Sequence, residues 1–347
     1  MGKISRKNWI LIWILGMTGQ ICWNIENSWF NTFVYDKIAP EPAIVSWMVG
    51  VSAAVSTFCT FLVGTWGDRK GKRKPFICIG YILWGIFTFI FGATEMIPKN
   101  PLFIAAACVV LADAVMSFFG SVGNDGGFGP WTTDISNEHN RGKLGGALAV
   151  MPVFATIFGA VVSGLIIDQI DFFAFFGLMG GLVAVVGVMA LFTLEDSPTL
   201  HPKRDEKGFW HQFLTVFNWE TVRGNKELFW VFLVMTVYFI GFNVYFPYIT
   251  IYFVNYLGYD YGMTGIIQGV GLLAAAVMTI PAARFIDKGK APQVIFTALL
   301  CNTAGLILVS LSQNLIILLA GVFGAGIGYI LVLQSLTAWM KNLYPEE

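Results

Sequence analysis

The loop Gly67-Asp68-Arg69-Lys70-Gly71-Lys72-Arg73-Lys74-Pro75 joins two apolar runs, residues 43–66 and 76–95. Each run has about the 20 residues that an α-helix needs to cross a bilayer. The loop carries five basic side chains, and Lys and Arg are retained preferentially on the cytoplasmic side. This stretch therefore predicts two membrane-spanning helices joined by a short, positively charged cytoplasmic loop.

The composition predicts that most of the chain lies in a membrane. Of 347 residues, 56% are hydrophobic and 12% are charged, whereas soluble domains carry roughly 25% charged residues. The 21 basic and 21 acidic side chains balance, so the chain lacks the excess of basic charge that binds nucleic-acid phosphates. We therefore expect an integral membrane protein in contact with lipid and without a nucleic-acid partner.

Ten apolar runs are long enough to span a bilayer. They cover residues 8–35, 43–66, 76–95, 101–127, 145–168, 172–194, 228–255, 263–284, 292–312 and 314–340. The longest interruption, residues 195–227, separates an N-terminal bundle of six helices (1–194) from a C-terminal bundle with four (228–347). Aromatic residues recur at helical spacing inside this interruption, which predicts a cytoplasmic central loop with an interfacial helix.

Basic residues alternate between the two sides of these ten spans. The loops on one side hold 19 of the 21 Lys and Arg residues, and the other side holds Lys37 and Lys99. Positively charged loops stay in the cytoplasm. We therefore expect a multi-pass protein of the plasma membrane, which is the inner membrane in a bacterium, with a cytoplasmic N-terminus.

Parts of the first half recur in the second half. An Asp, a Gly and a Lys follow the eighth span as Asp287, Gly289 and Lys290, in the same order as in the loop after the second span. The segment 339–347 is similar to the loop that begins at Trp131. If the halves are repeats, the second half lacks its last two helices.

The charged loop after the second span, its weaker copy after the eighth and the long central loop resemble the major facilitator superfamily. Within it, residues 67–77 together with Asn124, Gly129-Pro130, Asp134 and Asn140-Arg141-Gly142 are similar to the sucrose-type and glycoside-pentoside-hexuronide cation symporters. The resemblance implies an all-α polytopic fold of two pseudo-repeated bundles with twelve helices, so this chain, with ten, is expected to be C-terminally incomplete. Melibiose-type members carry acidic residues in the second helix, whereas residues 43–66 have none.

In a transporter of this kind, charged cytoplasmic loops can hold the two bundles together on one side. We interpret Asp68 as a gating residue that pairs with Arg141 or with a facing helix N-terminus. The candidate gating residues are Asp68, Arg69, Gly71, Arg73, Asp134, Arg141, Asp287 and Gly289. The two glycines would allow tight turns. The alternative for the basic residues is that they only keep the loop in the cytoplasm.

Three carboxylates lie inside the spans and away from the span ends: Glu26, Asp113 and Asp125. Ionisable side chains are costly in a bilayer and are candidates for function, and a carboxyl group deprived of water can hold a proton near neutral pH. Asp113 is our first candidate for coupling to a proton or cation, followed by Asp125 and Glu26. The alternative for Asp113 is a structural carboxyl that neighbouring helices satisfy. After Asp125, the run Gly-Gly-Phe-Gly-Pro at 126–130 is expected to weaken or break the fourth helix.

Amide side chains gather on one face of the first helix. Gln20, Asn24, Asn27 and Asn31 fall within about 80° of one another on a helical projection. Amides beside an indole ring suit a sugar, whose hydroxyls need hydrogen bonds and whose ring has an apolar face. The candidate substrate-binding residues are Trp13, Gln20, Asn24, Asn27, Asn124, Tyr245, Tyr248 and Gln268. The alternative is that the amides only join neighbouring helices.

Motifs for other functions are missing from the sequence. It has no GxxxxGK[ST] phosphate loop, no HExxH and no GxSxG, so we expect neither an ATP-driven pump nor an enzyme, and no cofactor or metal. The predicted function is secondary transport of a small polar solute, a sugar or glycoside, with a proton or cation, by a monomer. The alternatives are a non-sugar substrate such as an amphipathic drug, and a membrane protein that is receptor-like or truncated and inactive.

Overall fold

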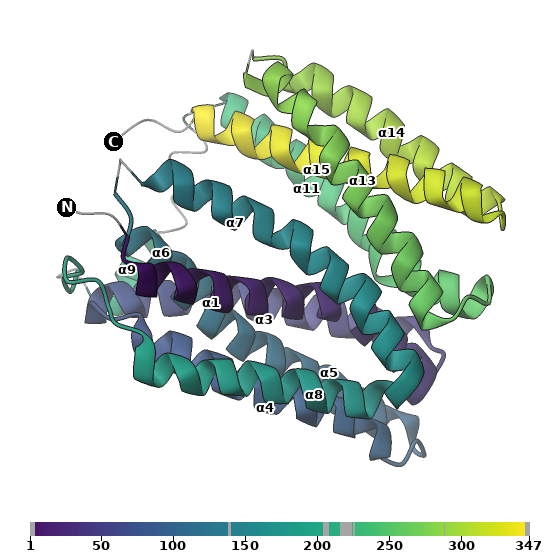
Figure 1. Ribbon diagram of the computed structural model, residues 1–347, viewed down its shortest axis with the longest axis horizontal. Helices are drawn as coiled ribbons and strands as arrows, with labels where there is room; N and C mark the ends of the chain where they lie inside the picture. Colours follow the sequence, from purple (N-terminus) through teal and green to yellow (C-terminus); the bar gives the residue numbers. More distant parts are fainter. Residues whose placement is uncertain are drawn as a thin grey trace. The chain divides into compact units, whose positions relative to one another are not determined.

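The computed structural model describes residues 4–137, 140–203, 208–215, 224, 226–287 and 289–343, without the side chains of residues 215, 283, 284, 287, 341 and 342. Helices joined by short turns account for almost all of the described residues, and none of these residues lies in a strand. The helices group into two units by their internal contacts (Figure 1). Unit 1 contains residues 1–155 and 166–217, and unit 2 contains residues 156–165 and 218–347.

Unit 1 is built on long helical runs. Its elements are α1 (Arg6–Ile25), η1 (Glu26–Phe30), α2 (Asn31–Phe33), η2 (Val34–Ile38), α3 (Pro42–Lys70), α4 (Lys74–Ala93), η3 (Thr94–Met96), α5 (Leu102–Gly120), η4 (Ser121–Phe128), α6 (Gly129–Asp134), most of α7 (Arg141–Thr156) and α8 (Ser163–Thr193), and α9 (Phe209–Thr215). Stacked phenylalanines join the first run to α4, since the rings of Phe30 and Phe91 lie 4.2 Å apart. Helix α5 packs against both α3 and α4.

Unit 2 is built on α11, α13, α14 and α15. Its elements are η5 (Ile157–Val162), α11 (Lys226–Tyr245), η6 (Phe246–Tyr248), α12 (Ile249–Ile251), η7 (Tyr252–Tyr256), α13 (Tyr261–Asp287), α14 (Ala291–Leu311) and α15 (Leu315–Leu343). Helix α15 packs against both α13 and α14 (Figure 1). A buried cluster that includes Val231, Ala298 and Val332 joins α11, α14 and α15.

Residues 156–165 continue α7 but belong to unit 2, where η5 packs against α13. Glycine makes this contact close, because a Cβ at Gly265 would collide with the carbonyl oxygen of Ala160. A Cβ at Gly269 would likewise meet the side chain of Val161. The chain therefore passes from unit 1 to unit 2 and back before the central loop begins.

Eight helical stretches among the described residues are long and apolar enough to cross a membrane. The ten spans expected from the sequence are therefore not confirmed by this measure. Two features explain the difference. The helical run Arg6–Ile38 is not among the eight, because its amide side chains lower its hydropathy. The stretch Arg141–Thr193 is one of the eight, although the backbone of Asp171 inside it is not helical, with φ 70°.

The helix does not break at residues 126–130, but it loses its regular α-helical winding up to residue 128. The helical path continues from α5 through η4 into α6, with η4 wound as a π-helix, and Pro130 lies in the first turn of α6. The wider turn accommodates a proline, which has no N–H to donate to the preceding turn. The glycines serve close packing, because Cβ atoms at Gly126 and Gly127 would meet Val63 at 2.8 Å and Ile77 at 2.9 Å.

Candidate functional site

Two carboxyl groups of unit 1, the buried Asp113 and the half-buried Glu26, come from different helical runs. The Ser52 hydroxyl on α3 donates a hydrogen bond of 2.6 Å to Oδ2 of Asp113 on α5. The Ser117 hydroxyl, one turn after Asp113, donates a bond of 3.0 Å to Oε1 of Glu26. The charges of Glu26 and Asp113 interact electrostatically, and Asp113 is only 1% exposed. We call Glu26, Ser52, Asp113 and Ser117 the carboxyl cluster.

This part of unit 1 has more buried acceptor atoms than donors. Each carboxyl of the carboxyl cluster has one buried oxygen without a hydrogen-bond partner, Oε2 of Glu26 and Oδ1 of Asp113. The amide oxygens of Asn24 and Asn31, on the same helical run as Glu26, are also buried without a partner. A buried acceptor that finds no donor costs about 1–3 kcal/mol. A proton on either carboxyl group would bind its unpaired oxygen directly.

The third carboxylate, Asp125, lies in a different environment. Its Oδ2 accepts a hydrogen bond of 3.1 Å from the Ser121 hydroxyl and its Oδ1 accepts one of 3.0 Å from the Asn124 amide. The Tyr81 hydroxyl is 3.2 Å from Oδ1 of Asn124 and 2.8 Å from the carbonyl oxygen of Leu15. Both oxygens of Asp125 thus have donors, and Asn124 belongs to this buried network, which ties η4 to α4 and α1.

The amide stripe of the first helix is only partly available to a ligand. Asn27 is exposed, and its amide donates to the carbonyl oxygen of Trp23 at 2.7 Å. The Asn31 amide donates to the carbonyl oxygen of Asn27 at 3.3 Å. Gln20 and Asn24 are half-buried, and Trp13 is 38% exposed. The amide donors of Asn27 and Asn31 therefore bond within their own helix, whereas the oxygens of Asn24 and Asn31 stay unpaired.

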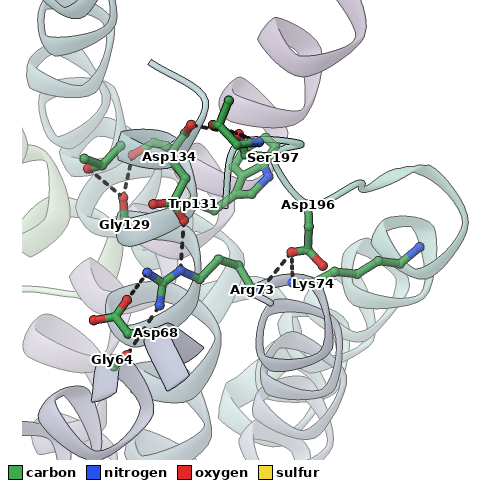
Figure 2. Close-up of polar contacts among 12 residues, drawn as sticks. Gly64, Asp68, Arg73, Lys74, Gly129, Trp131, Asp134, Asp196 and Ser197 are labelled. Carbon is green, nitrogen blue, oxygen red and sulfur yellow. Dashed lines mark hydrogen bonds and ion pairs between the residues drawn. The ribbon is translucent and has the colours of Figure 1, made fainter. Parts of the chain in front are cut away.

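A second buried charge cluster surrounds Arg73, at the turn between α3 and α4. Figure 2 shows Asp68 and Asp134 converging on its guanidinium group. The Nε of Arg73 donates to Oδ2 of Asp134 at 2.9 Å, and one terminal nitrogen donates to Oδ1 of Asp68. The side chain of Arg73 is only 5% exposed. Burial lowers the pKa of the Arg73 guanidinium, but the bonds to Asp134 and Asp68 outweigh it and raise the pKa overall.

The segment after α8 packs onto this Arg73 cluster (Figure 2). Oδ1 of Asp196 accepts hydrogen bonds from the backbone N–H groups of Arg73 at 2.7 Å and Lys74 at 2.8 Å, and so caps the start of α4. The Ser197 hydroxyl donates to the backbone carbonyl oxygen of Asp134 at 2.9 Å. The Trp131 indole N–H donates to the backbone carbonyl oxygen of Glu195 at 3.0 Å. An exposed ion pair with Lys7 lowers the pKa of Glu195.

The remaining gating candidates have other surroundings. Asp68 pairs with Arg73, and its expected pairing with Arg141 is not found among the described residues, where Arg141 is exposed. Arg69 donates to Oε1 of Gln212 at 3.1 Å and lies over the ring of Phe209, 6.0 Å from its centroid. The side chain of Asp287 lies outside the described residues, whereas the backbone of Gly289 is described.

Gly71 and Gly289 both have left-handed backbones, with φ 63° and φ 74°. At Gly71 a Cβ would also meet the backbone nitrogen of Pro202 at 2.8 Å, whereas at Gly289 it would meet none of the described atoms. We expect Gly71→Ala to destabilise the protein by about 2–3 kcal/mol, combining left-handed strain with a clash. Gly289→Ala introduces only the left-handed strain and should destabilise the protein by about 1–2 kcal/mol. Thermal unfolding in detergent measures both, and equal effects would contradict the contact with Pro202.

The unit 2 candidates include both packed and partly accessible side chains. The Gln268 amide donates to the Thr250 hydroxyl at 3.0 Å, and both residues are buried, which is typical of helix packing. Tyr248 is half-buried in the 3-10 turn η6. Tyr245 is half-buried and its hydroxyl lies 3.5 Å from the amide of Asn302 on α14.

Several site residues were missed from the sequence. Ser52 and Asn302 are each one of several polar residues in otherwise apolar helices, so the sequence does not single them out. Asp196 and Ser197 lie in the central loop, far from α4 and α6 in sequence, so no local pattern marks their contacts. Within the part of the chain that is described, no three His, Cys, Asp or Glu side chains come together as metal ligands.

Comparison with known proteins shows that the chain is similar to a large group of membrane transporters. The family model described as "Major Facilitator Superfamily" matches residues 9–347. Among solved structures, the nucleoside transporter NupG is 12% identical with a TM-score of 0.71, over 96% of this chain and 87% of that chain. The xylose transporter XylE from E. coli, in a partially occluded inward-open conformation, is 16% identical with a TM-score of 0.66, over 96% and 90%. A D-xylose-proton symporter is 17% identical with a TM-score of 0.57, over 96% and 88%.

No match was found among curated proteins. The identities to the solved structures are low, so those similarities establish a shared fold and no more.

Proposed function

The chain belongs to the major facilitator superfamily, and from this premise we propose that it moves a small uncharged polar solute, a sugar or glycoside, by alternating access coupled to a proton. The proposed function is transport alone, without an enzymatic activity and without a cofactor. The observation that carries the coupling is the carboxyl cluster, where each of the two carboxyl groups has one buried oxygen without a hydrogen-bond partner. A proton bound to one of these oxygens would remove a buried negative charge.

Within the carboxyl cluster we propose Asp113 as the proton-binding group and Glu26 as its partner. Asp113 is almost fully buried and keeps one oxygen unpaired. Ser117 joins the two sites, because it follows Asp113 by one turn and donates to Glu26. Asp125 is a weaker candidate, since donors already occupy both of its oxygens.

The charge distribution supports an uncharged solute. The spans expected from the sequence hold no Lys, Arg or His deep in the membrane, so an anionic solute would have no counter-charge. The solved structures with this fold include a D-xylose-proton symporter and a nucleoside transporter. Xylose and nucleosides are both uncharged rings that carry hydroxyl groups, which is the chemistry that the amides and tyrosines of this chain suit.

The topology that we propose has ten spans, with the N-terminus in the cytoplasm of a plasma or bacterial inner membrane. The continuous helical run Arg6–Ile38 and the break at Asp171 support ten spans rather than eight. The Arg73 cluster would then lie on the cytoplasmic side, together with 19 of the 21 basic residues. We propose that the protein acts as a monomer.

The test is solute-driven proton movement in liposomes that contain the purified protein and a pH-sensitive dye. We would add D-glucose, D-galactose, D-xylose, sucrose, phenyl β-D-glucoside and uridine in turn. Acidification of the interior after one of the sugars or the glycoside, absent from empty liposomes and abolished by a protonophore, is the expected result. Radiolabelled uptake without proton movement would disprove the coupling. No uptake of any compound by a folded, inserted protein would disprove transport of this solute class.

A further inference from the structure

The Ser52 hydroxyl on α3 lies between two acceptors. Its Oγ is 2.6 Å from Oδ2 of Asp113 on α5 and 2.7 Å from the backbone carbonyl oxygen of Met48, one turn earlier on α3. Both Ser52 and Asp113 are buried. A hydroxyl group has a single hydrogen, so Ser52 makes a full hydrogen bond to only one of these acceptors at a time. The charge of Asp113 decides which one.

While Asp113 is ionised, its carboxylate is the stronger acceptor. Hydrogen bonds to an ionised partner are roughly twice as strong as those between neutral groups. The Ser52 hydroxyl therefore turns towards Asp113, and this bond ties α3 to α5, two helices that pack against each other. The carbonyl oxygen of Met48 is then left to the backbone hydrogen bonds of α3.

A proton on Asp113 reverses the bond. The proton binds Oδ1, which has no hydrogen-bond partner, and the carboxyl group can turn over because its terminal torsion is roughly two-fold. The protonated oxygen then faces Ser52 and donates to its Oγ, while Ser52 donates its own hydrogen to the carbonyl oxygen of Met48. The new O–H bond of Asp113 is the only covalent change. Both hydroxyl donors have an acceptor in this arrangement.

The reversal acts on α3. The bond between α3 and α5 loses its charge assistance, and a serine that donates to the carbonyl group four residues earlier tends to bend its helix. The part of α3 from Ser52 to its end at Lys70 is about 27 Å long, so a bend of about 5° moves that end by about 2 Å. That end carries Asp68, which pairs with Arg73.

We propose that Ser52 is a positioning residue that converts the protonation of Asp113 into a movement of α3. Ser52 itself neither gains nor loses a proton in this step. The inference rests on the proposed function, since the proton is the one coupled to transport, and it deepens that function by naming how the proton changes the protein.

Two other carboxyl groups lie within the same helical bundle. Glu26 on η1 is joined to α5 through Ser117, and Asp125 lies about three turns after Asp113, in η4. Among the described residues, the carboxyl group that the Ser52 side chain contacts is that of Asp113. The elements α3, α4, η2 and η3 also pack against α5. Their titratable side chains are Tyr35, Asp36, Lys37, Cys59, Asp68, Arg69, Lys70, Lys74, Cys78, Tyr81 and Glu95.

Infrared and distance measurements on the purified protein in lipid nanodiscs test this proposal. Infrared difference spectra between alkaline and acidic pH show the carboxyl band of protonated Asp113, identified by its loss in Asp113→Asn. With the five native cysteines replaced, a spin label at Lys70→Cys is paired with one at Lys7→Cys on α1 or at Phe192→Cys on α8. All three positions are exposed residues of unit 1. At least one distance should change by about 2 Å over the pH range in which the Asp113 band appears.

Ser52→Ala should keep the infrared band, because Asp113 still takes up a proton, but should lose the distance change. Ser52→Thr keeps the hydroxyl group and should restore it, and Asp113→Asn should show no change at any pH. Thr57→Val is the matched control, because the exposed Thr57 hydroxyl donates to the carbonyl oxygen of Ala53 on the same helix. It should respond as the parent protein does. Thermal unfolding shows that each variant folds.

The proposal is overturned if Ser52→Ala or Asp113→Asn keeps the distance change, or if the parent protein shows none. An Asp113 that never takes up a proton would overturn it as well. A distance change that depends on Ser52, in a protein without proton-driven uptake, would instead contradict only the proposed function.

Discussion

Asp113→Asn is expected to abolish accumulation of the solute against its gradient while leaving exchange of solute across the membrane. Asparagine keeps the size of the side chain and can still accept from Ser52, but it cannot take up a proton. A membrane potential of about 100 mV supplies about 2.3 kcal/mol per charge, which corresponds to roughly 50-fold accumulation. We therefore expect the ratio of internal to external solute to fall from up to about 50 to one, measured in energised vesicles with radiolabelled solute.

Asp125→Asn is the control for this result. Both oxygens of Asp125 already accept hydrogen bonds, from Ser121 and Asn124, so this variant should retain accumulation. Glu26→Gln should resemble Asp113→Asn, because the two carboxyl groups interact and Ser117 joins them. If Asp113→Asn still accumulates solute, or if Asp125→Asn loses accumulation equally, the assignment of the proton to Asp113 is wrong.

The second large effect is expected at Arg73, where replacement by alanine should destabilise unit 1 by about 3 kcal/mol. Removing one partner of a buried ion pair leaves an uncompensated charge, at a cost of about 3–5 kcal/mol. The lower value applies because Asp68 is 43% exposed while Asp134 is 18% exposed. The unfolding temperature in detergent should fall by about 5 °C or more.

Lys72→Ala is the matched control for Arg73→Ala. Lys72 is the preceding residue, carries the same charge and is exposed, so its loss should change stability by less than about 0.5 kcal/mol. Arg73→Lys keeps the charge but loses the planar fork that reaches Asp68 and Asp134 together, and should be intermediate. Equal unfolding temperatures for the Arg73→Ala and Lys72→Ala variants would show that the Arg73 cluster contributes no more than surface charges do.

Much of the fold class could be predicted from the sequence, because a bilayer restricts its proteins to a few structures. Apolar runs of helical length and the charged loop at 67–75 were sufficient to indicate a polytopic helical protein, and the family match agrees. The number of spans was harder to predict. The first run carries five amide side chains, which lower its hydropathy. Asp171 interrupts a long helical stretch at a single residue, so the number of spans depends on whether hydropathy or backbone geometry defines them.

The candidate site was predictable only as single residues. Hydropathy marks Asp113 and Glu26 because a carboxylate in an apolar run is rare. It cannot indicate that Ser52 bonds Asp113, since that contact joins residues 61 positions apart. The pairing of Asp68 with Arg73 rather than with Arg141 depends on the turn that Gly71 makes. The π-helical winding of residues 121–128 has no clear sequence signal. Side-chain partners depend on tertiary contacts, which the order of residues along the chain does not reveal.

Residues 156–165 determine how the protein should respond to cleavage of its backbone in the central loop. The chain joins the two units at three points, 155–156, 165–166 and 217–218, so cleavage in the central loop would not divide it into self-sufficient halves. A fragment ending at 217 would carry away the segment that covers Gly265 and Gly269 of α13. Two fragments expressed together should therefore associate and restore this contact. The fragment 218–347 expressed alone should aggregate.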